Sequence, residues 1–365
     1  MTHKKRPLFV FAGQSNMMGA AVYPPSEQIR FADSYEYLHK PRRFGEDRGD
    51  FKKTAFPTGE FSYEDMAAAY SPLDDFRALS SLNAFFEHTF FCPAMSNLKD
   101  EADKSVYPFA DYSEANFVPS PCLPPYLVRE WEARGHVCAY THIAKGAVSI
   151  EHYLNPEMLA RFDRERASIP GAADASHRPA MTGAAGAYFD EKTRDFFADS
   201  EARFPDDDLS VRALFWLQGE SDAGRSEEEY LLALRLLWEQ AQALGFTHFF
   251  CVRVGHWGDD AIANVIAAQE RFCRETAHAF MLTRVGSYMP RPGHDESGWF
   301  AKEPPEEAIA CRDSHYGFSN DHYNQKGFEL IASRCTPNLE RVLCDHLPPI
   351  LEDELLRPLL AAEKQ

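Results

Sequence analysis

The chain lacks a long apolar run and has comparatively little positive charge. No stretch approaches the roughly 18 consecutive apolar residues of a membrane-spanning helix, so the sequence excludes such a helix. Its 38 Lys and Arg residues stand against 56 Asp and Glu residues, which gives a formal net charge of −18. Nucleic acids and anionic membranes select basic protein surfaces. We therefore expect neither of them as a partner.

Paired metal-ligand motifs are also absent. The 8 Cys residues form no Cys-x-x-Cys pair, and the 14 His residues form no His-x-x-x-His or His-Glu-x-x-His motif. We therefore expect no metal ion and no cofactor. The apolar segment Leu8–Phe11 is too short for the core of a signal peptide and leads to no small-residue cleavage site. We interpret it as a strand, and we expect a cytoplasmic protein with buried free thiols.

Short apolar segments and amphipathic segments alternate along the chain. The apolar ones have the composition of strands buried on both faces, and they are Leu8–Ala12, Val137–Ala144, Val211–Leu217, His248–Val254 and Ala279–Val285. Helical spacing is found in Leu123–Arg134, Glu191–Arg203, Glu227–Leu244, Ile262–Thr276 and Gln325–Leu343. This alternation predicts a single α/β domain over residues 1–365. We expect a three-layer α/β/α sandwich with a central parallel sheet of about five strands.

Two segments interrupt the alternation. A large insertion at about 22–120, after the first strand, is rich in aromatic residues without clean periodicity and is far longer than a normal connection. It is interpreted either as a lid or substrate wall or as a structural elaboration such as an oligomer contact. Residues 155–185 are rich in Ala, Gly, Pro and Ser, which predicts a surface loop. The sequence gives no prediction of the oligomeric state.

Ser15 follows the first predicted strand directly, in Gly13-Gln14-Ser15-Asn16-Met17. Open α/β sheets bind ligands at the carboxyl ends of their strands, and the adjacent Gly13 permits a tight turn there. A serine at this position is a candidate nucleophile. It is also a candidate helix cap, because serine is a common N-cap residue.

Two further segments carry suitable chemistry. The third predicted strand ends in Gln218-Gly219-Glu220-Ser221-Asp222, where the Gln218 amide has the N–H groups to stabilise an oxyanion. An alternative interpretation of this segment is a helix start. His322 begins His-Tyr-Asn-Gln-Lys-Gly, and an imidazole there has the pKa range of a general base.

These segments resemble, in order, the sequence blocks of the SGNH hydrolase superfamily, in its sialate O-acetylesterase and acetylxylan esterase branch. The matching blocks begin at Gly13, Trp216 and His322, with a weaker match around Gly146. The resemblance implies a flavodoxin-like fold with Ser15 as nucleophile and His322 as base. It also implies an oxyanion hole formed by Ser15, Gly146 and Gln218. Ala147 stands where the family has a second glycine.

The acid of the triad is left open. The family places an Asp three residues before the His, but Ser319 occupies that position. Glu220, Asp313 and Asp321 are the candidates, and Glu220 is preferred because some acetylxylan esterases of the family use this Glu. Its alternative role is to hold its own loop by accepting backbone N–H groups.

Substrate-binding candidates lie around these blocks. Gln14 and Asn16 flank the nucleophile, and Arg253 and His256 follow the fourth predicted strand at the same edge of the sheet. Gln269 resembles a Gln on the following helix of family members, with a structural role as the alternative.

The sequence therefore predicts a serine esterase that removes O-acetyl groups from a carbohydrate through an acyl-enzyme. Alternatives are a sugar O-acyltransferase, a lipase-like esterase for longer acyl groups, and an inactive carbohydrate-binding or scaffold protein. The identity of the sugar and the position of its acetyl group do not follow from the residues.

Overall fold

A sheet of seven strands forms the centre of the molecule. The computed structural model describes residues 3–18, 29–39, 49–55, 122–144, 148–170, 172, 182–255, 260–288, 322–323 and 325–352. The strand order is β4-β3-β6-β1-β7-β8-β9. In sequence order these strands are β1 (Leu8–Gly13), β3 (Tyr35–His39), β4 (Gly49–Lys52), β6 (Ala139–Ala144), β7 (Arg212–Leu217), β8 (His248–Val252) and β9 (Ala279–Thr283). All neighbours pair in parallel except β4, which pairs antiparallel with β3.

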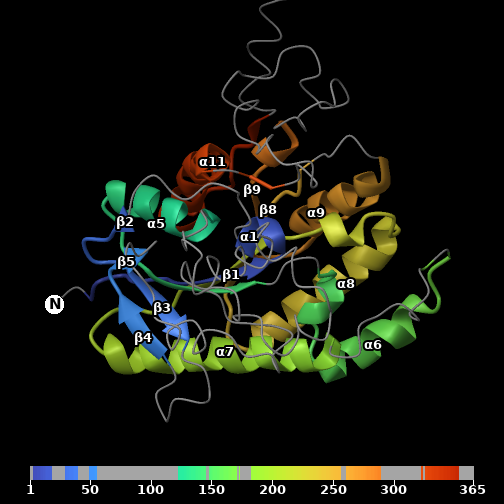
Figure 1. Ribbon diagram of the computed structural model, residues 1–365, viewed down its shortest axis with the longest axis horizontal. Helices are drawn as coiled ribbons and strands as arrows, with labels where there is room; N and C mark the ends of the chain where they lie inside the picture. The colour runs from blue at the N-terminus through green and yellow to red at the C-terminus, as the bar shows by residue number, and fades with distance from the viewer. Residues whose placement is uncertain are drawn as a thin grey trace, which may run out of the picture.

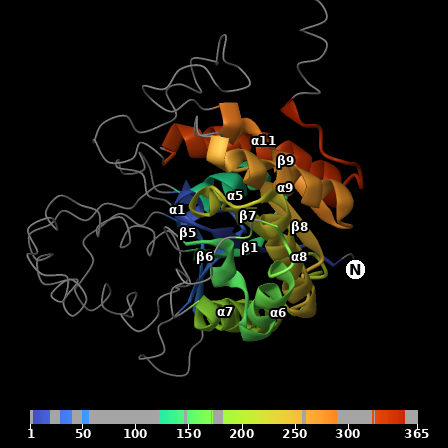
Figure 2. The ribbon, with the colours of Figure 1, turned by 90° about the vertical axis from the view of Figure 1, so that its right-hand side faces the viewer.

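The strands are buried on both faces, as their continuous apolar sequences predict. In β1, Leu8 and Val10 enter one core, whereas Phe9 and Phe11 enter the other. The first core is covered by α6 (Pro156–Arg166), α7 (Thr182–Arg203), α8 (Glu227–Ala243) and α9 (Ala263–Glu275). The second is covered by α5 (Leu123–Ala133) and α11 (Gln325–Leu343). Figures 1 and 2 show the sheet between these two helical layers, so the predicted three-layer α/β/α fold is confirmed.

All five predicted strands and all five predicted helices are present. Their ends differ from the predicted ones by a few residues, except that α7 begins at Thr182 rather than near Glu191. The sheet is larger than predicted, because the insertion adds β3 and β4 to one edge. It also supplies β2 (Ile29–Arg30) and β5 (Thr54–Ala55), which form a small antiparallel pair. The aromatic residues from 85 to 109 lie outside the described residues.

The prediction of a surface loop over 155–185 is wrong for its first part. Residues Pro156–Arg166 form α6, and Thr182 already belongs to α7. The start of α6 is fixed by Asn155, whose side-chain oxygen accepts the Met158 N–H at 3.0 Å. Pro156 then occupies the first helical turn, where its missing N–H removes no helical bond. Pro156, one of the residues that favoured a loop, is in fact part of the start signal of a helix, together with the Asn155 cap.

The cysteines that the structure describes are free thiols. Cys122, Cys138, Cys251 and Cys335 are buried, Cys273 is half-buried and Cys344 is exposed. Burial raises the pKa of the Cys138 thiol, a shift that a hydrogen bond with Ser34 partly opposes, so this thiol stays protonated at neutral pH. Among the described helices, none is both long and apolar enough to cross a membrane.

Candidate active site

Ser15 lies just beyond β1, the central strand of the parallel sheet. It begins the short helix α1 (Ser15–Met18) and is partly exposed. The turn before it requires glycine at position 13. Gly13 has a φ of 156°, and a Cβ placed on it would lie 2.0 Å from the Leu217 carbonyl oxygen. With β6 on one side of β1 and β7 on the other, Ser15 occupies the position at which such sheets bind ligands.

Gln14 joins this turn to the one that follows β7. Its side-chain oxygen accepts the Ser221 N–H at 3.0 Å and an N–H of the Gln218 amide at 3.1 Å. The side chain is buried, with 3% of its surface exposed. Gln14 thus fixes the positions of two loops relative to each other, and its predicted contact with substrate stays a prediction.

Asn16 connects the three sequence blocks that carry the predicted triad. Its amide N–H donates to Oε1 of Glu220 at 2.6 Å. Its side-chain oxygen accepts the backbone N–H of Tyr323 at 3.1 Å. Asn16 follows Ser15, and Tyr323 follows His322. One fully buried amide therefore brings the segments of the predicted nucleophile, acid and base together.

His322 is held through its neighbour. Tyr323 is fully buried, and its ring packs against Phe328 with the ring centres 5.9 Å apart. Gly286 leaves room for this tyrosine, because a Cβ at position 286 would lie 2.7 Å from the Tyr323 hydroxyl. His322 itself is partly exposed. A partly exposed imidazole on an anchored backbone suits a base that exchanges protons with substrate and water.

Glu220 begins the short 3₁₀ turn η6 (Glu220–Asp222) after β7 and is half-buried. Its contact with Asn16 places it beside the nucleophile segment. The other two candidates for the triad acid, Asp313 and Asp321, lie outside the described residues, as do Gly146, Ala147 and His256. The choice among the three carboxylates therefore stays a prediction.

Gln218 is fully buried and extensively hydrogen-bonded. Its Nε2 lies 3.0 Å from the Val148 oxygen, 2.5 Å from Oδ2 of Asp222 and 3.1 Å from Oε1 of Gln14. Its Oε1 accepts the Tyr230 hydroxyl at 2.8 Å. An amide has only two N–H groups, so donation to an oxyanion requires Gln218 to give up one of these acceptors. In the structure it holds neighbouring loops together.

The side chains of Arg253 and Gln269 are also hydrogen-bonded to other protein groups. Arg253 is buried, and its guanidinium donates to Oε1 of Glu270 at 2.7 Å. Gln269 is fully buried, accepts the Val254 N–H at 3.0 Å and donates to the Gln218 carbonyl at 2.7 Å. Gln269 thus has the structural role that was its alternative, since it supports the turn that begins at Gln218.

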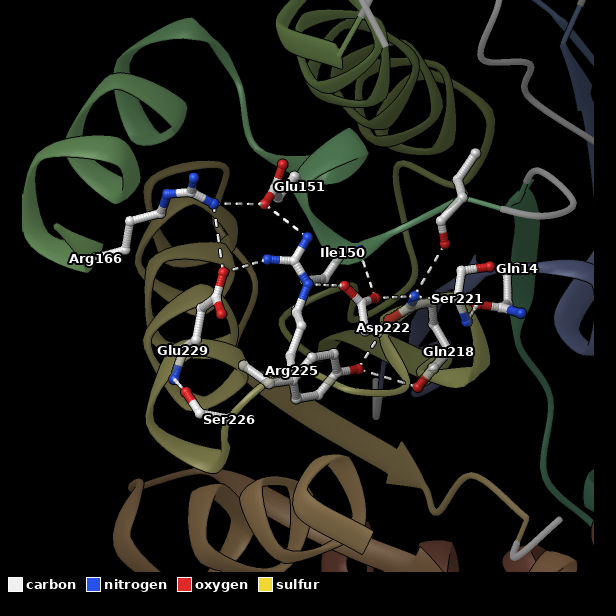
Figure 3. A network of polar contacts seen from close by, with 12 residues as sticks. Gln14, Ile150, Glu151, Arg166, Gln218, Ser221, Asp222, Arg225, Ser226 and Glu229 are labelled. Carbon is white, nitrogen blue, oxygen red and sulfur yellow. Dashed lines mark hydrogen bonds and ion pairs between the residues drawn. The ribbon is translucent and has the colours of Figure 1, made fainter. Parts of the chain in front are cut away.

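Sequence reasoning missed a buried ionic network beside this turn, shown in Figure 3. Arg225 contacts the carboxylates of Asp222, Glu151 and Glu229 at 2.6, 2.8 and 2.6 Å. Arg166 lies 3.3 Å from Glu229 and 3.6 Å from Glu151. The available signal was the spacing of Asp222 and Glu229, three residues before and four after Arg225. The contribution of the distant Glu151 and Arg166 had no signal in the sequence.

The acidic members of this network are strongly desolvated. Burial raises the pKa of Asp222 to about 6, although the Arg225 guanidinium, the Gln218 amide and the Ile150 N–H all oppose the shift. Among the described residues, no group of three or more His, Cys, Asp or Glu side chains could hold a metal ion.

Comparisons with known proteins give only distant matches. No protein-family model matches the sequence, and no curated protein matches it. The fold is similar to that of NanS, at 12% identity and a TM-score of 0.48, covering 94% of this chain and 99% of that chain. It is also similar to XAC1771, a carbohydrate acetylesterase from Xanthomonas citri, at 10% identity and a TM-score of 0.42 over 93% of this chain and 57% of that one.

An Arabidopsis thaliana protein matches at 14% identity and a TM-score of 0.41, over 93% of this chain and the whole of that one. At such identities and TM-scores these likenesses assign no activity. This chain is thus an α/β/α protein that is distantly similar to NanS, to a carbohydrate acetylesterase and to a plant protein.

Proposed function

We propose that this chain is a serine esterase that removes O-acetyl groups from a carbohydrate. The observation that carries the proposal is the Asn16 side chain, which follows Ser15 and contacts both Glu220 and the residue after His322. Three segments far apart in the sequence, each with one residue type of a hydrolytic triad, thereby meet at one end of the central strand. The resemblance of the sequence blocks supplies the carbohydrate ester as substrate class, and XAC1771 is described as a carbohydrate acetylesterase.

In the proposed reaction, His322 takes the proton of the Ser15 hydroxyl as Oγ attacks the ester carbonyl. The tetrahedral oxyanion accepts hydrogen bonds from the backbone N–H groups of Ser15 and Gly146. It also accepts one from the Gln218 amide after this side chain has given up one of its present acceptors. Collapse of this intermediate breaks the ester bond, and His322 returns the proton to the leaving sugar hydroxyl. Water then attacks the acetyl-enzyme while His322 takes its proton, and collapse of the second intermediate releases acetate as His322 returns that proton to Ser15 Oγ. Glu220 stabilises the imidazolium in both steps.

The test is hydrolysis of p-nitrophenyl acetate and p-nitrophenyl butyrate by the wild type and by Ser15→Ala. We expect hydrolysis with a preference for acetate, and a loss of kcat of at least about 10³-fold in the variant. A fluorophosphonate should label Ser15 of the wild type, with loss of fluoride. Ser333→Ala, at an exposed position of α11, is the matched control and should retain full activity and labelling.

Glu220→Gln tests the choice of acid, because glutamine keeps the shape and removes the charge. We expect kcat to fall by about 10²-fold or more. Full activity in Glu220→Gln would transfer the role to Asp313 or Asp321. Full activity in Ser15→Ala would overturn the proposed mechanism, and an inactive wild type that still binds sugars would favour the binding protein.

A further inference from the structure

The network around Arg225 joins two loops at the carboxyl end of the sheet. One is η6, which contains Glu220 and follows β7. The other is the segment 148–153 after β6, which includes the 3₁₀ turn η4 (Ile150–Tyr153). The Ile150 N–H donates to Oδ2 of Asp222 at 2.9 Å, and the Val148 oxygen accepts from Gln218 at 3.0 Å. Both loops are thereby fixed to each other through side chains rather than through strand pairing.

Arg225 supplies the charge that allows this contact to be buried. The side chains of Asp222, Glu151 and Glu229 are 0 to 3% exposed, and all three face Arg225, whose own side chain is 14% exposed. Figure 3 shows the guanidinium of Arg225 in the middle of these carboxylates. Arg166 adds a second positive charge from α6. Removing one partner from such a buried group leaves an uncompensated charge, which is far more costly than breaking an exposed pair.

We infer that Arg225 and Asp222 are positioning residues that hold the η6 turn, and with it Glu220, in the geometry required for ester hydrolysis. Neither residue touches the reacting atoms. Asp222 shares the η6 turn with Glu220 and contacts the Gln218 amide, and Arg225 holds Asp222 against the segment that begins at Val148. The inference rests on the proposed function, because it assigns a role in that same site.

This role predicts a particular pH dependence. The charged and titratable groups around Asp222 are Arg225 beside it, Glu151 of η4 and Tyr230 of α8. Arg225 also contacts Glu229 of α8, and Arg166 of α6 lies near Glu151 and Glu229. Burial raises the pKa of this carboxyl to about 6, and Arg225 is the main group that lowers it. Without Arg225 the pKa of Asp222 rises further, so its protonation and the loosening of η6 begin at higher pH. The acidic limb of the activity profile should move in the same direction.

The experiment measures p-nitrophenyl acetate hydrolysis from pH 5 to 9 by the wild type, Arg225→Met and Arg225→Lys. We expect Arg225→Met to lose about 10- to 100-fold in kcat at pH 7, with KM changed by less than about threefold. Its acidic limb should lie about one pH unit higher than that of the wild type. Arg225→Lys keeps the charge. It should therefore regain part of the lost kcat, and its acidic limb should lie close to that of the wild type.

Arg271→Met is the matched control. Arg271 also contacts three carboxylates, those of Glu227, Glu228 and Glu275, but it lies on α9 at the surface and is half-buried. This variant should keep the wild-type kcat and pH profile. An equal loss in Arg271→Met would overturn the inference, because the effect would then reflect the removal of any cation from the chain.

Hydrogen exchange at the Ile150 amide provides a readout that does not depend on turnover. This N–H donates to Asp222, so it should exchange at least about tenfold faster in Arg225→Met than in the wild type. If Arg225→Met does not fold, Arg225→Lys is compared in both measurements. If the Arg225 variants keep the wild-type exchange rate at the Ile150 amide and the wild-type pH profile, the positioning role is overturned while the proposed function still stands. Hydrolysis that survives Ser15→Ala would instead overturn the proposed function, whatever the Arg225 variants do.

Discussion

At the scale of single residues, the Asn16 side chain must both donate and accept a hydrogen bond. It donates to the Glu220 carboxylate and accepts from the Tyr323 backbone, both in a fully buried position. An amide meets both demands, because its side chain carries an acceptor oxygen and two N–H donors, whereas a carboxylate accepts but does not donate and a hydrocarbon does neither. Its contacts make it a connector between the segments of the site, and its predicted contact with substrate stays a prediction.

Replacement of Asn16 should therefore affect activity in a pH-dependent way. Asn16→Asp keeps an acceptor for the Tyr323 N–H but sets a second carboxylate against Glu220, and two adjacent carboxylates resist ionising together. We expect the ratio of variant to wild-type kcat/KM to be at least about tenfold lower at pH 8 than at pH 6. Steady-state kinetics across this range measure the ratio.

The matched control for this prediction is Asn338→Asp. Asn338 is a buried amide on α11 that donates to the Leu282 and Ile350 carbonyls at 2.8 and 3.0 Å. It contacts none of the predicted triad segments in the described structure. Asn338→Asp should lower the stability but leave the ratio of activities constant with pH. A constant ratio for Asn16→Asp as well would show that its amide does not face an ionised Glu220.

At the scale of elements, the start of α6 shows how a capping side chain also serves tertiary packing. The Asn155 oxygen accepts the Met158 N–H, and its amide donates to Oδ2 of Asp190 on α7 at 2.9 Å. Gln240 of α8 donates to the same carboxylate at 2.7 Å. Burial raises the pKa of Asp190, and these two amides oppose the shift. Three helices thus meet at one hydrogen-bonded carboxylate.

Asn155→Ala removes both the cap and one of these donors. We expect the free energy of unfolding to fall by about 1–2 kcal/mol, with kcat/KM unchanged, because the Asn155 side chain bonds Met158 and Asp190 and not the predicted triad. Urea unfolding measures the first quantity. Asn155→Ser keeps a capping oxygen and should lose less stability. Equal losses in the two variants would show that the cap contributes nothing.

The order of elements was readable from sequence because each strand is a short apolar run and each helix has one apolar stripe. Residues 156–166 were misread because proline favours loops and the first turn of a helix alike. The strands β3 and β4 were not predicted, because they lie in a segment without clean periodicity. Their place at the edge of the sheet depends on pairing with β6, a contact that no local pattern encodes.

At the scale of the whole molecule, the two cores on either side of the sheet bury titratable groups whose pKa shifts make stability depend on pH. His142 of β6 is 1% exposed and pairs in register with Phe11 of the central strand. Burial lowers the pKa of this imidazole from 6.5 to about 3, and the Met17 backbone opposes the shift. The unfolded chain therefore binds a proton between pH 6.5 and 3 that the folded chain does not bind.

Stability should consequently fall as the pH falls through this window, by at most about 1.4 kcal/mol per pH unit from this group. In His142→Leu the free energy of unfolding should fall less between pH 6.5 and 4, because the unfolded variant no longer takes up the proton that the wild type binds at His142. Urea unfolding at several pH values measures the slopes. His346→Asn, at an exposed position with a φ of 55°, is the control and should keep the wild-type slope. Parallel curves for His142→Leu would contradict the prediction.

The sequence by itself determined the alternation of strands and helices, the position of Ser15 after the first strand, and the residue types available for ester hydrolysis. These follow from local rules, since hydrophobic periodicity and turn glycines act over a few residues. The tertiary structure decided which of these side chains face one another. It gave Gln14, Asn16 and Gln218 their places as buried connectors, and it brought Glu151 and Arg166 from distant elements into the network of Arg225, Asp222 and Glu229. Such contacts join residues far apart in the chain, and the desolvation that gives them their strength exists only after the sheet and both helical layers have packed.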